Sequence, residues 1–403
     1  MTRDAPSFSK QYSRRVVAEV LLHKAPLSRA ELARATGLSK QTISIVVADL
    51  ETEGWVRSVG ISKGAIGRTA VSYDLARDAA FSIGVDLGGA KVSIAIADLI
   101  GKPIGELTEP TDPRGGAHVL RQVHEIAFRL AAREGLDLDR ARSVVVGMPG
   151  VVDPETGAVD LVPNIRDLSS INTPKLLADL FGQPVVIEND VNLAMLGEVW
   201  QGCAHGAENA AFVAIGAGVG LGLIVNGQLV RGARGAAGEI AYLPIGRDLE
   251  SLDARTVGAF ELEVGAAGIL RRYHSGGAHP VGSVRELFDR LESGDASALK
   301  TIEATARTVA LALTAVEAVV DPQLIVLGGS IGIRPELVER VRLALHFFFA
   351  RTVDIRVSAL GARAGLIGAV SLAVSRLHND LFGMSGVPKE LSVPGVVAGR
   401  AAA

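Results

Sequence analysis

An aspartate followed by glycines stands at the end of a predicted strand, in the run Asp86-Leu87-Gly88-Gly89-Ala90-Lys91. Glycines let backbone amides approach a phosphate, and the carboxylate can orient a metal ion. A second glycine loop, Gly216-Ala217-Gly218-Val219-Gly220, follows about 130 residues later and matches neither a dinucleotide fingerprint nor a P-loop. Either loop alone is a weak signal, because strand-end glycines are common. Their recurrence in equivalent positions favours a phosphate-binding cleft.

Two further segments carry carboxylates and amides that can hold a polyol. In Ile187-Glu188-Asn189-Asp190-Val191-Asn192, followed by Glu198, a strand ends in polar residues that open a helix. Asp190 can accept hydrogen bonds from a polyol, but Asn189 or Asp190 can equally cap the helix. Glu239 lies in the glycine-flanked turn 235–242 and is either a ligand or a surface charge. Spacing alone does not decide between these alternatives.

A third kind of chemistry is predicted near the N-terminus, where polar side chains gather on the first turn of a predicted helix over 40–53. Such a turn enters the major groove in recognition helices, where Gln, Lys, Ser and Thr bond base edges or phosphates. Lys63 and Arg68, in the following hairpin, can reach a flanking phosphate or the minor groove. The alternative is an ordinary solvated helix face. The predicted DNA-binding residues are Ser39, Lys40, Gln41, Thr42, Ser44, Lys63 and Arg68.

The elements around this turn predict a winged helix-turn-helix. An amphipathic helix is expected over 9–24, ended by Pro26, and Ser28 with Glu31 forms a capping box for a helix that stops at Gly37. Ser39 caps the third helix, whose apolar residues fall at helical spacing. Two short strands at 55–59 and 69–75 complete the order of a winged helix.

From Phe81 the pattern changes to a strand, a glycine bend, a second strand, a turn and a third strand, and it recurs from Ala210. Asn226-Gly227 in the second copy suits a type I′ hairpin. Interleaved helices are expected at 117–134, 173–181, 190–201, 283–291 and 296–320, so the fold class is α/β with two lobes. The predicted domains are a winged helix over 1–77, a two-lobe domain over 81–382 and a disordered tail over 383–403.

Composition limits the class of protein. The chain has 403 residues and a net charge of −3. Residues 1–76 hold 11 Lys and Arg against 7 Asp and Glu, so the N-terminal end is basic and the remainder acidic. Cys203 is the single cysteine, so an intramolecular disulfide is excluded. We expect Cys203 to be a buried small apolar side chain. With no secretion signal and no bilayer-length apolar run, we expect a cytoplasmic protein.

Taken together, these motifs resemble the ROK family, which unites sugar kinases with sugar-responsive repressors. The resemblance covers about residues 10–380 and rests on the winged helix, DLGGAK, VGMPGVVDPETG, VPNI, IENDVN with GE, GAGVGLGLIVNGQLVRGARGAAGEI and IVLGGS. It implies a sugar-kinase fold of the actin type with a sugar in its cleft. By motif it places the sugar contacts at Asn164, Asn189, Asp190, Glu239 and Glu261, with Asp190 at the position of the kinases' general base.

Departures from the family pattern argue against catalysis. Kinases of the family usually read GGTK and GTG, whereas this chain has Ala90 and Ala217, which lack the hydroxyls that would bond ATP phosphates. Asp86 and Lys91 are retained, which leaves residual nucleotide binding open. The resemblance therefore implies vestigial nucleotide loops, made of Asp86, Gly88, Gly89, Lys91, Gly216, Gly218, Gly328 and Gly329.

A second departure concerns zinc and the sugar. The family commonly has a histidine and a cysteine cluster after the GE motif, but residues 244–261 contain neither Cys nor His. No structural zinc or other cofactor is expected. Tyr242 replaces a residue that contacts sugar in relatives, so the identity of the sugar stays open.

The sequence predicts a sugar-responsive, DNA-binding regulator, a repressor of carbohydrate-utilisation genes, that binds a palindromic operator as a homodimer or a dimer of dimers. Its partners would be operator DNA and a sugar effector. One alternative is an active ATP-dependent sugar kinase that also binds DNA. Another is a regulator that no longer binds sugar and responds to a protein partner.

Overall fold

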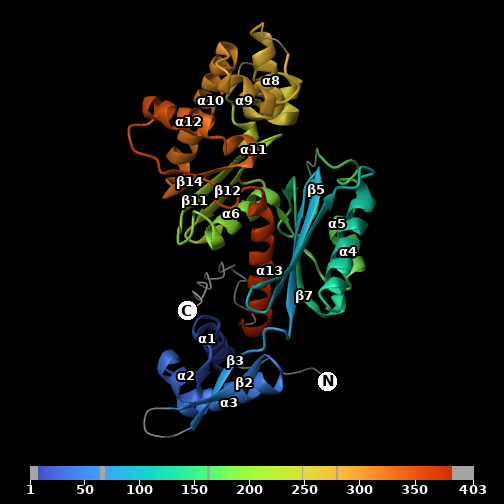
Figure 1. The fold of residues 1–403 in the computed structure, drawn as a ribbon, viewed down its shortest axis with the longest axis vertical. Coiled ribbons are helices and arrows are strands. Elements are labelled where there is room, and N and C mark those ends of the chain that lie inside the picture. Colours follow the sequence, from blue (N-terminus) through green and yellow to red (C-terminus); the bar gives the residue numbers. More distant parts are fainter. Residues whose placement is uncertain (1–7, 64–68, 161–163, 247, 278–279, 384–403) are drawn as a thin grey trace. The chain divides into compact units, whose positions relative to one another are not determined.

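The computed structural model describes residues 8–63, 69–160, 164–246, 248–277 and 280–383. The chain divides into two compact units, which are described separately (Figure 1). Unit 1 comprises Met1–Val146, Lys175–Val186 and Ala369–Ala403, and unit 2 comprises Gly147–Pro174 and Ile187–Gly368. From residue 384 on, the predicted tail lies outside the described residues.

Unit 1 begins with the predicted winged helix, and its helices fall within a residue or two of their expected bounds. β3 is the central strand of a three-stranded sheet with the order β1-β3-β2, in which it pairs with both neighbours antiparallel. The elements are α1 (Phe8–Lys24), β1 (Leu27–Ser28), α2 (Arg29–Thr36), α3 (Lys40–Thr52), β2 (Val56–Lys63) and β3 (Thr69–Leu75).

The winged helix shares its hydrophobic core with later parts of unit 1. Buried side chains of the three helices, such as Leu21, Leu32 and Val47, cluster with Leu99 and with two residues of α13 (Ala364–Phe382), Leu377 and Phe382. The end of α13 is also held by polar contacts. His378 Nε2 lies 2.6 Å from the carbonyl oxygen of Leu99, and Arg14 Nη2 donates to the carbonyl of Leu381 at 3.4 Å.

The rest of unit 1 contains most of a five-stranded sheet with the order β10-β7-β4-β5-β6, of whose strand β10 only the first residue, Val186, belongs to unit 1. Its strands and helices include β4 (Phe81–Leu87), β5 (Lys91–Asp98), β6 (Pro103–Pro110), α4 (Gly116–Arg133), β7 (Ala141–Met148), α5 (Thr173–Phe181) and β10 (Val186–Asn189). The predicted sequence of strand, glycine bend, strand, turn and strand is confirmed in β4, β5 and β6, which pair antiparallel.

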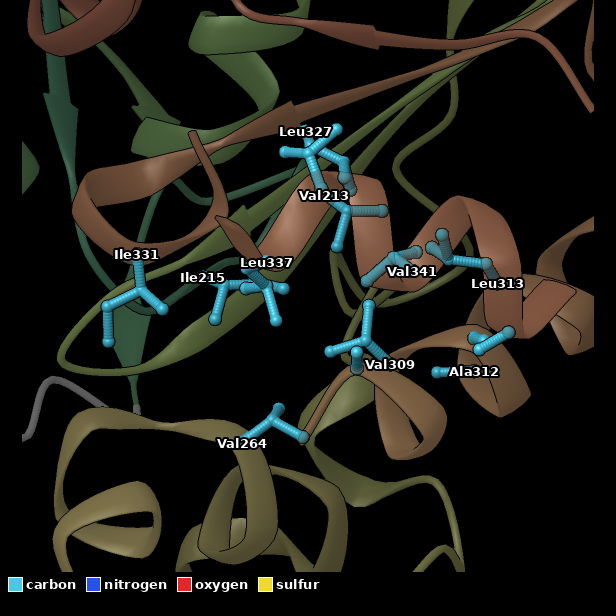
Figure 2. Close-up of a cluster of buried hydrophobic side chains, with 14 of the residues drawn as sticks. Val213, Ile215, Val264, Val309, Ala312, Leu313, Leu327, Ile331, Leu337 and Val341 are labelled. Carbon is cyan, nitrogen blue, oxygen red and sulfur yellow. The ribbon is translucent and has the colours of Figure 1, made fainter. Parts of the chain in front are cut away.

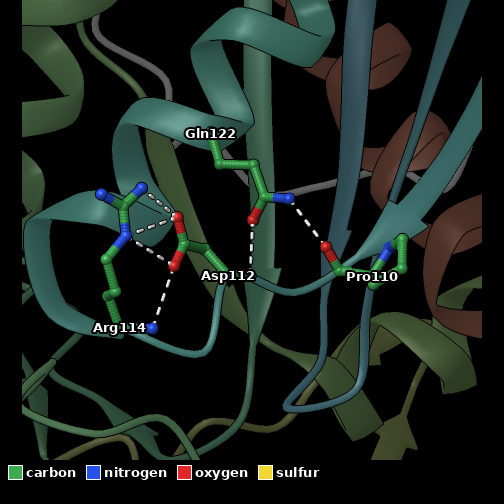
Figure 3. A network of polar contacts seen from close by, with 4 residues as sticks. All are labelled: Pro110, Asp112, Arg114 and Gln122. Atoms are coloured by element: carbon green, nitrogen blue, oxygen red, sulfur yellow. Dashed lines mark hydrogen bonds and ion pairs between the residues drawn. The ribbon is translucent and has the colours of Figure 1, made fainter.

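A polar network fixes the connection from β6 to α4 (Figure 3). The side chain of Gln122 accepts from the backbone amide of Asp112 at 2.9 Å and donates to the carbonyl of Pro110 at 2.7 Å. Arg114 pairs with Asp112, and its hydrogen bonds lower the pKa of that carboxyl to about 2. The network anchors the chain next to Thr111, which contacts the first glycine loop.

Unit 2 contains a second five-stranded sheet with the order β13-β12-β11-β14-β15, in which β11 pairs antiparallel with β12 and parallel with β14. Asn226 and Gly227 both have positive φ, of 53° and 74°, as the predicted type I′ hairpin between β12 and β13 requires. The strands of this sheet are β11 (Ala210–Ile215), β12 (Val219–Val225), β13 (Gln228–Leu229), β14 (Leu324–Gly328) and β15 (Ile355–Val357). A separate antiparallel pair is formed by β8 (Val151–Val152) and β9 (Val159–Asp160).

Helices of unit 2 bury an apolar core against this sheet. Figure 2 shows Val213 and Leu327 of neighbouring strands together with Val309 of α10 and Val341 of α12. These four side chains are fully buried. The helices are α6 (Asp190–Gln201), α7 (Ala259–Val264), α8 (Ala266–Ser275), α9 (Val284–Glu292), α10 (Ala296–Val320), α11 (Gly329–Gly332) and α12 (Pro335–Phe348). Within the described ranges, no helix is long and apolar enough to cross a membrane.

Candidate functional site

Local capping interactions position the predicted recognition helix, α3. The capping box at the start of α2 is formed as predicted, with Ser28 and Glu31 bonding each other's backbone amides at 3.3 and 2.8 Å. Gly37 ends α2 in the left-handed conformation, with φ of 73°, which glycine adopts without strain. Ser39 Oγ then caps α3 by accepting from the amide of Thr42 at 3.1 Å.

Not all of the predicted DNA contacts are equally available on α3. Lys40 and Gln41 are exposed, whereas Thr42 and Ser44 are partly buried. Ser39 is exposed but engaged, since its hydroxyl lies 2.8 Å from the hydroxyl of Thr42 and caps the helix. Lys40 and Gln41 are therefore the side chains of this turn that are free to reach a groove.

The predicted wing contacts are only partly within the described chain. Lys63 is the last residue of β2, and its side chain is not among those described. Arg68 lies outside the described residues. Both stay predictions.

Helix α1 holds the opposite end of α3 through two salt bridges. Lys10 Nζ lies 2.8 Å from Asp49 Oδ2, and Arg14 Nη1 lies 2.6 Å from Glu53 Oε1. The guanidinium of Arg14 lowers the pKa of Glu53. These pairs neutralise Asp49 of α3 and its C-cap residue Glu53, and the first turn of the helix carries no acidic residue.

The second candidate site is built where β10 passes into α6, in unit 2. Asn189 is the N-cap of α6: its Oδ1 accepts from the amides of Val191 and Asn192 at 2.9 and 3.0 Å, and its Nδ2 donates to the carbonyl of Gly150 at 3.0 Å. Asn189 therefore caps the helix, which was one of the two alternatives for this segment beside contact with a polyol. Asp190 Oδ1 accepts from the amide of Val191 at 2.8 Å, and the residue as a whole is partly buried.

A buried ion pair supports this cap, and sequence reasoning missed it. Glu188, whose side chain is 5% exposed, accepts from Asn192 Nδ2 at 2.9 Å and pairs with Arg231 at 2.7 Å. Because the two residues of the pair are 43 positions apart, no local pattern indicates their contact. The pair keeps the charge of Glu188 from adding to that of neighbouring Asp190.

The first residues of β12 bring three carboxylate-bearing segments together. A Cβ at Gly220 would lie 2.8 Å from Val191 Cγ2, so the start of α6 packs closely on β12. The amide of Val219 donates to Glu261 Oε2 at 2.8 Å. The amide of Leu221 donates to the carbonyl of Gly238 at 3.1 Å, next to Glu239. This short stretch of β12 thereby anchors the segments that carry Asp190, Glu239 and Glu261.

The electrostatics of these three residues differ from those of surface acids. Burial raises the pKa of Asp190 and of Glu261. Burial also raises the pKa of Glu239, and the charges of Asp190 and Glu261 raise it further. Glu239 is therefore not an ordinary surface charge. Ionised carboxylates are strong hydrogen-bond acceptors for hydroxyl groups.

Two other predicted sugar-site positions are exposed. Asn164 is a solvent-exposed turn residue directly after residues 161–163, which are outside the described ranges. The side chain of Tyr242 is 40% exposed, and its hydroxyl donates to the carbonyl of Thr256 at 3.1 Å. The tyrosine is thus tied to the segment between Glu239 and Glu261.

The first glycine loop forms a tight turn between β4 and β5 in unit 1. The amide of Gly88 donates to the carbonyl of Lys91 at 2.9 Å, and the hydroxyl of Thr111 donates to the carbonyl of Gly88 at 2.6 Å. Gly89, Ala90 and Lys91 are exposed, and Asp86 is partly buried near the end of β4.

The second glycine loop lies in unit 2, beside the segment that follows β14. A Cβ at Gly216 would lie 3.5 Å from Ser330 Oγ, and the amide of Gly216 donates to the carbonyl of Gly218 at 2.9 Å. Gly328 and Gly329 have packing reasons to be glycine, because a Cβ would collide with the ring of Phe212 and with the backbone of Ile215. Ala217 is exposed.

Cys203 departs from its expected buried, apolar role. The residue is half-buried, and burial and the nearby charge of Glu198 raise the pKa of its thiol to about 11. Glu198 itself is fully buried, and it accepts from the amide of Cys203 at 2.9 Å and from the amide of Leu360 at 3.1 Å. Glu198 thus fastens the end of α6, and the thiol is poorly suited to act as a nucleophile.

Comparison with known proteins identifies the two parts of the chain. The model of the ROK family matches residues 82–376, and that of the MarR family matches residues 15–69. A glucokinase of Thermotoga maritima is 28% identical over 73% of this chain and 98% of its own length. A xylose repressor of Bacillus spizizenii is 26% identical over 91% of this chain and 96% of its own length.

A solved structure resembles nearly the whole chain. It is a ROK family transcriptional regulator described as a homologue of the E. coli MLC protein, with 22% identity and a TM-score of 0.74. The similarity covers 93% of this chain and 98% of that one. At this identity the match shows a shared fold, in which a winged helix precedes a sugar-kinase-like domain.

Proposed function

Because this chain belongs to the ROK family and joins the ROK domain to a MarR-type winged helix, we propose that it is a transcriptional repressor whose binding to operator DNA is controlled by a sugar. The observation that carries the proposal is the winged helix itself. It presents Lys40 and Gln41, exposed, on the first turn of a helix that is capped and free of acidic residues there. The similar xylose repressors, which match over 91% of this chain and 96% of their own length, support it.

The sugar would bind at Asp190, Glu239 and Glu261 in unit 2. Their carboxylates accept hydrogen bonds from hydroxyl groups, which suits a neutral, unphosphorylated sugar. A sugar phosphate would bring negative charge to three carboxylates and be repelled. Asn164 and Asn189 complete the proposed sugar site, with Asn189 acting through the helix cap that it forms.

Kinase activity is proposed to be lost, although glucokinases are among the similar proteins. Ala90 and Ala217 are exposed in their loops and have no hydroxyl with which to bond a phosphate. Phosphoryl transfer depends on positioning and electrostatic stabilisation, and each lost bond to a charged group costs roughly 1.5–3 kcal/mol. The general-base position, Asp190, would then serve only as a hydrogen-bond acceptor.

The remaining partners and cofactors follow from the same proposal. Two winged helices of a homodimer would bind the two halves of a palindromic operator, and a dimer of dimers is equally compatible with it. The protein would work in the cytoplasm. It would contain no structural zinc, because residues 244–261 offer no Cys or His as ligands. Elemental analysis of the purified protein checks this expectation, and one zinc per chain would contradict it.

Two assays on the full-length protein test the function. Mobility shift on the DNA upstream of its own gene, across a panel of neutral sugars and their phosphates, should reveal one sugar that weakens a specific complex. A coupled assay for ADP release with the same panel should show no activity above background. ADP release would establish the kinase alternative. Absence of specific DNA binding would refute the repressor.

A further inference from the structure

Helix α3 exposes a large apolar side chain. Ile45 is 53% exposed, although the neighbouring apolar residues of the same helix, such as Val46 and Val47, are buried in the core. Gln41 and Ala48, four residues before it and three after, are exposed as well. At this spacing the three side chains share one stripe of the helix.

The fold alone gives no reason for an isoleucine at this position. A β-branched residue is a weaker helix former than Ala, Lys or Glu, and an exposed side chain gains nothing from the core. Charge does not explain it either. Asp49 and Glu53 are paired with α1, which leaves Glu51 as the exposed carboxylate of the helix, in its last turn and off the stripe.

We propose that Ile45 recognises a thymine in the operator through contact with its 5-methyl group. In the major groove thymine is distinguished by this methyl, which an apolar side chain can contact and which cytosine lacks. Gln41 reads a neighbouring base by hydrogen bonds. The two positions are about 6 Å apart along the helix, which corresponds to one or two base pairs at ~3.4 Å each. The inference rests on the proposed function, because it assumes that α3 enters the major groove.

Replacing thymine by deoxyuridine tests the contact, since it removes the methyl and nothing else. The operator is first selected from random duplexes with the full-length protein. Each thymine is then replaced in turn, and dissociation constants are measured at one salt concentration for wild type, Ile45→Ala, Ile45→Val and Val319→Ala. The last variant is the matched control, a β-branched residue that is 84% exposed at the end of α10.

We expect one thymine per half-site at which uracil weakens wild-type binding by about three- to tenfold, the effect of burying roughly one methyl group. Ile45→Ala should lose a similar factor on the thymine operator and be indifferent to uracil at that position. The affinity of Ile45→Val for the thymine operator should lie between those of wild type and Ile45→Ala. Val319→Ala should bind both operators like wild type. Binding to random DNA should be equal in all four proteins.

Two outcomes would overturn the inference. Wild type could be indifferent to uracil at every position, or Ile45→Ala could keep the full sensitivity of wild type. Both are distinguishable from failure of the proposed function, in which no sequence is selected and all duplexes bind alike.

Discussion

Asp190 stands at the start of α6, where its carboxylate can hold a sugar hydroxyl or merely complete the helix terminus. Asp190→Asn keeps the oxygen that accepts from the amide of Val191, so the helix should remain intact. The variant replaces a charged acceptor by a neutral one, so its sugar affinity should fall by roughly 1.5–3 kcal/mol. Its sugar-free form should bind DNA like wild type. Calorimetry with the sugar found by screening measures the difference, and equal affinities would assign Asp190 to capping alone.

Glu239 should make the sugar-free protein less stable at neutral pH. Its pKa is raised from 4.5 by burial and by the charges of Asp190 and Glu261, so its ionised form is disfavoured in the folded state. This destabilisation is present above the raised pKa and fades as pH falls towards 4.5, where the unfolded chain also takes up the proton. Glu239→Gln should therefore raise the melting temperature at pH 7 to 8 and have little effect near pH 4, and it should weaken sugar binding.

A matched control for this prediction is Glu303→Gln, an exposed glutamate of α10. It should leave the melting temperature and the sugar affinity unchanged at every pH. If Glu239→Gln behaves like this control, the three carboxylates do not form a shared site.

Substitutions in and next to helix α3 can separate effects on stability from effects on DNA recognition. Ser39→Ala removes the helix cap and should cost about 1 kcal/mol of stability. Gln41→Ala touches no structural contact and should leave the melting temperature unchanged, while operator binding loses ~1–3 kcal/mol relative to random DNA. Thermal melts and competition binding distinguish the two. A Gln41→Ala protein that still prefers its operator would show that this turn of α3 does not read the sequence.

Local signals made the winged helix and the two strand units predictable. The capping box of Ser28 and Glu31 and the Asn226-Gly227 turn are each determined by residues within four positions of one another. The support of the sugar site is different. Glu261 reaches Val219 across 42 positions, and Arg231 reaches Glu188 across 43. Only the folded backbone brings such residues together, so sequence patterns indicated the carboxylates but not the contacts that hold them.

The same limit applies to the whole molecule, where sequence placed a domain boundary after residue 77. In the structure, the core of the winged helix extends past that boundary to Leu99 and to Leu377 and Phe382 of α13. Helix α13 therefore contributes to the stability of the winged helix, although the two are more than 280 residues apart in the sequence. Effects on DNA binding can arise far from the recognition helix in sequence.

Phe382→Ala tests this dependence, because the ring is 3% exposed in the shared core. Removing a buried phenylalanine usually costs 3–5 kcal/mol. In Phe382→Ala, amide hydrogen exchange should accelerate in α1 and α3. Operator affinity should also fall, although Phe382 is not one of the proposed DNA-contacting residues. Exchange in α10, which belongs to unit 2, should stay unchanged.

Phe347→Ala is the matched control, since that ring is 78% exposed on α12 and should change neither quantity. Unaltered exchange in α1 with Phe382→Ala would mean that the winged helix is stable without α13. An accelerated exchange would show that the DNA-binding helices depend on the last helix of the ROK domain for part of their core.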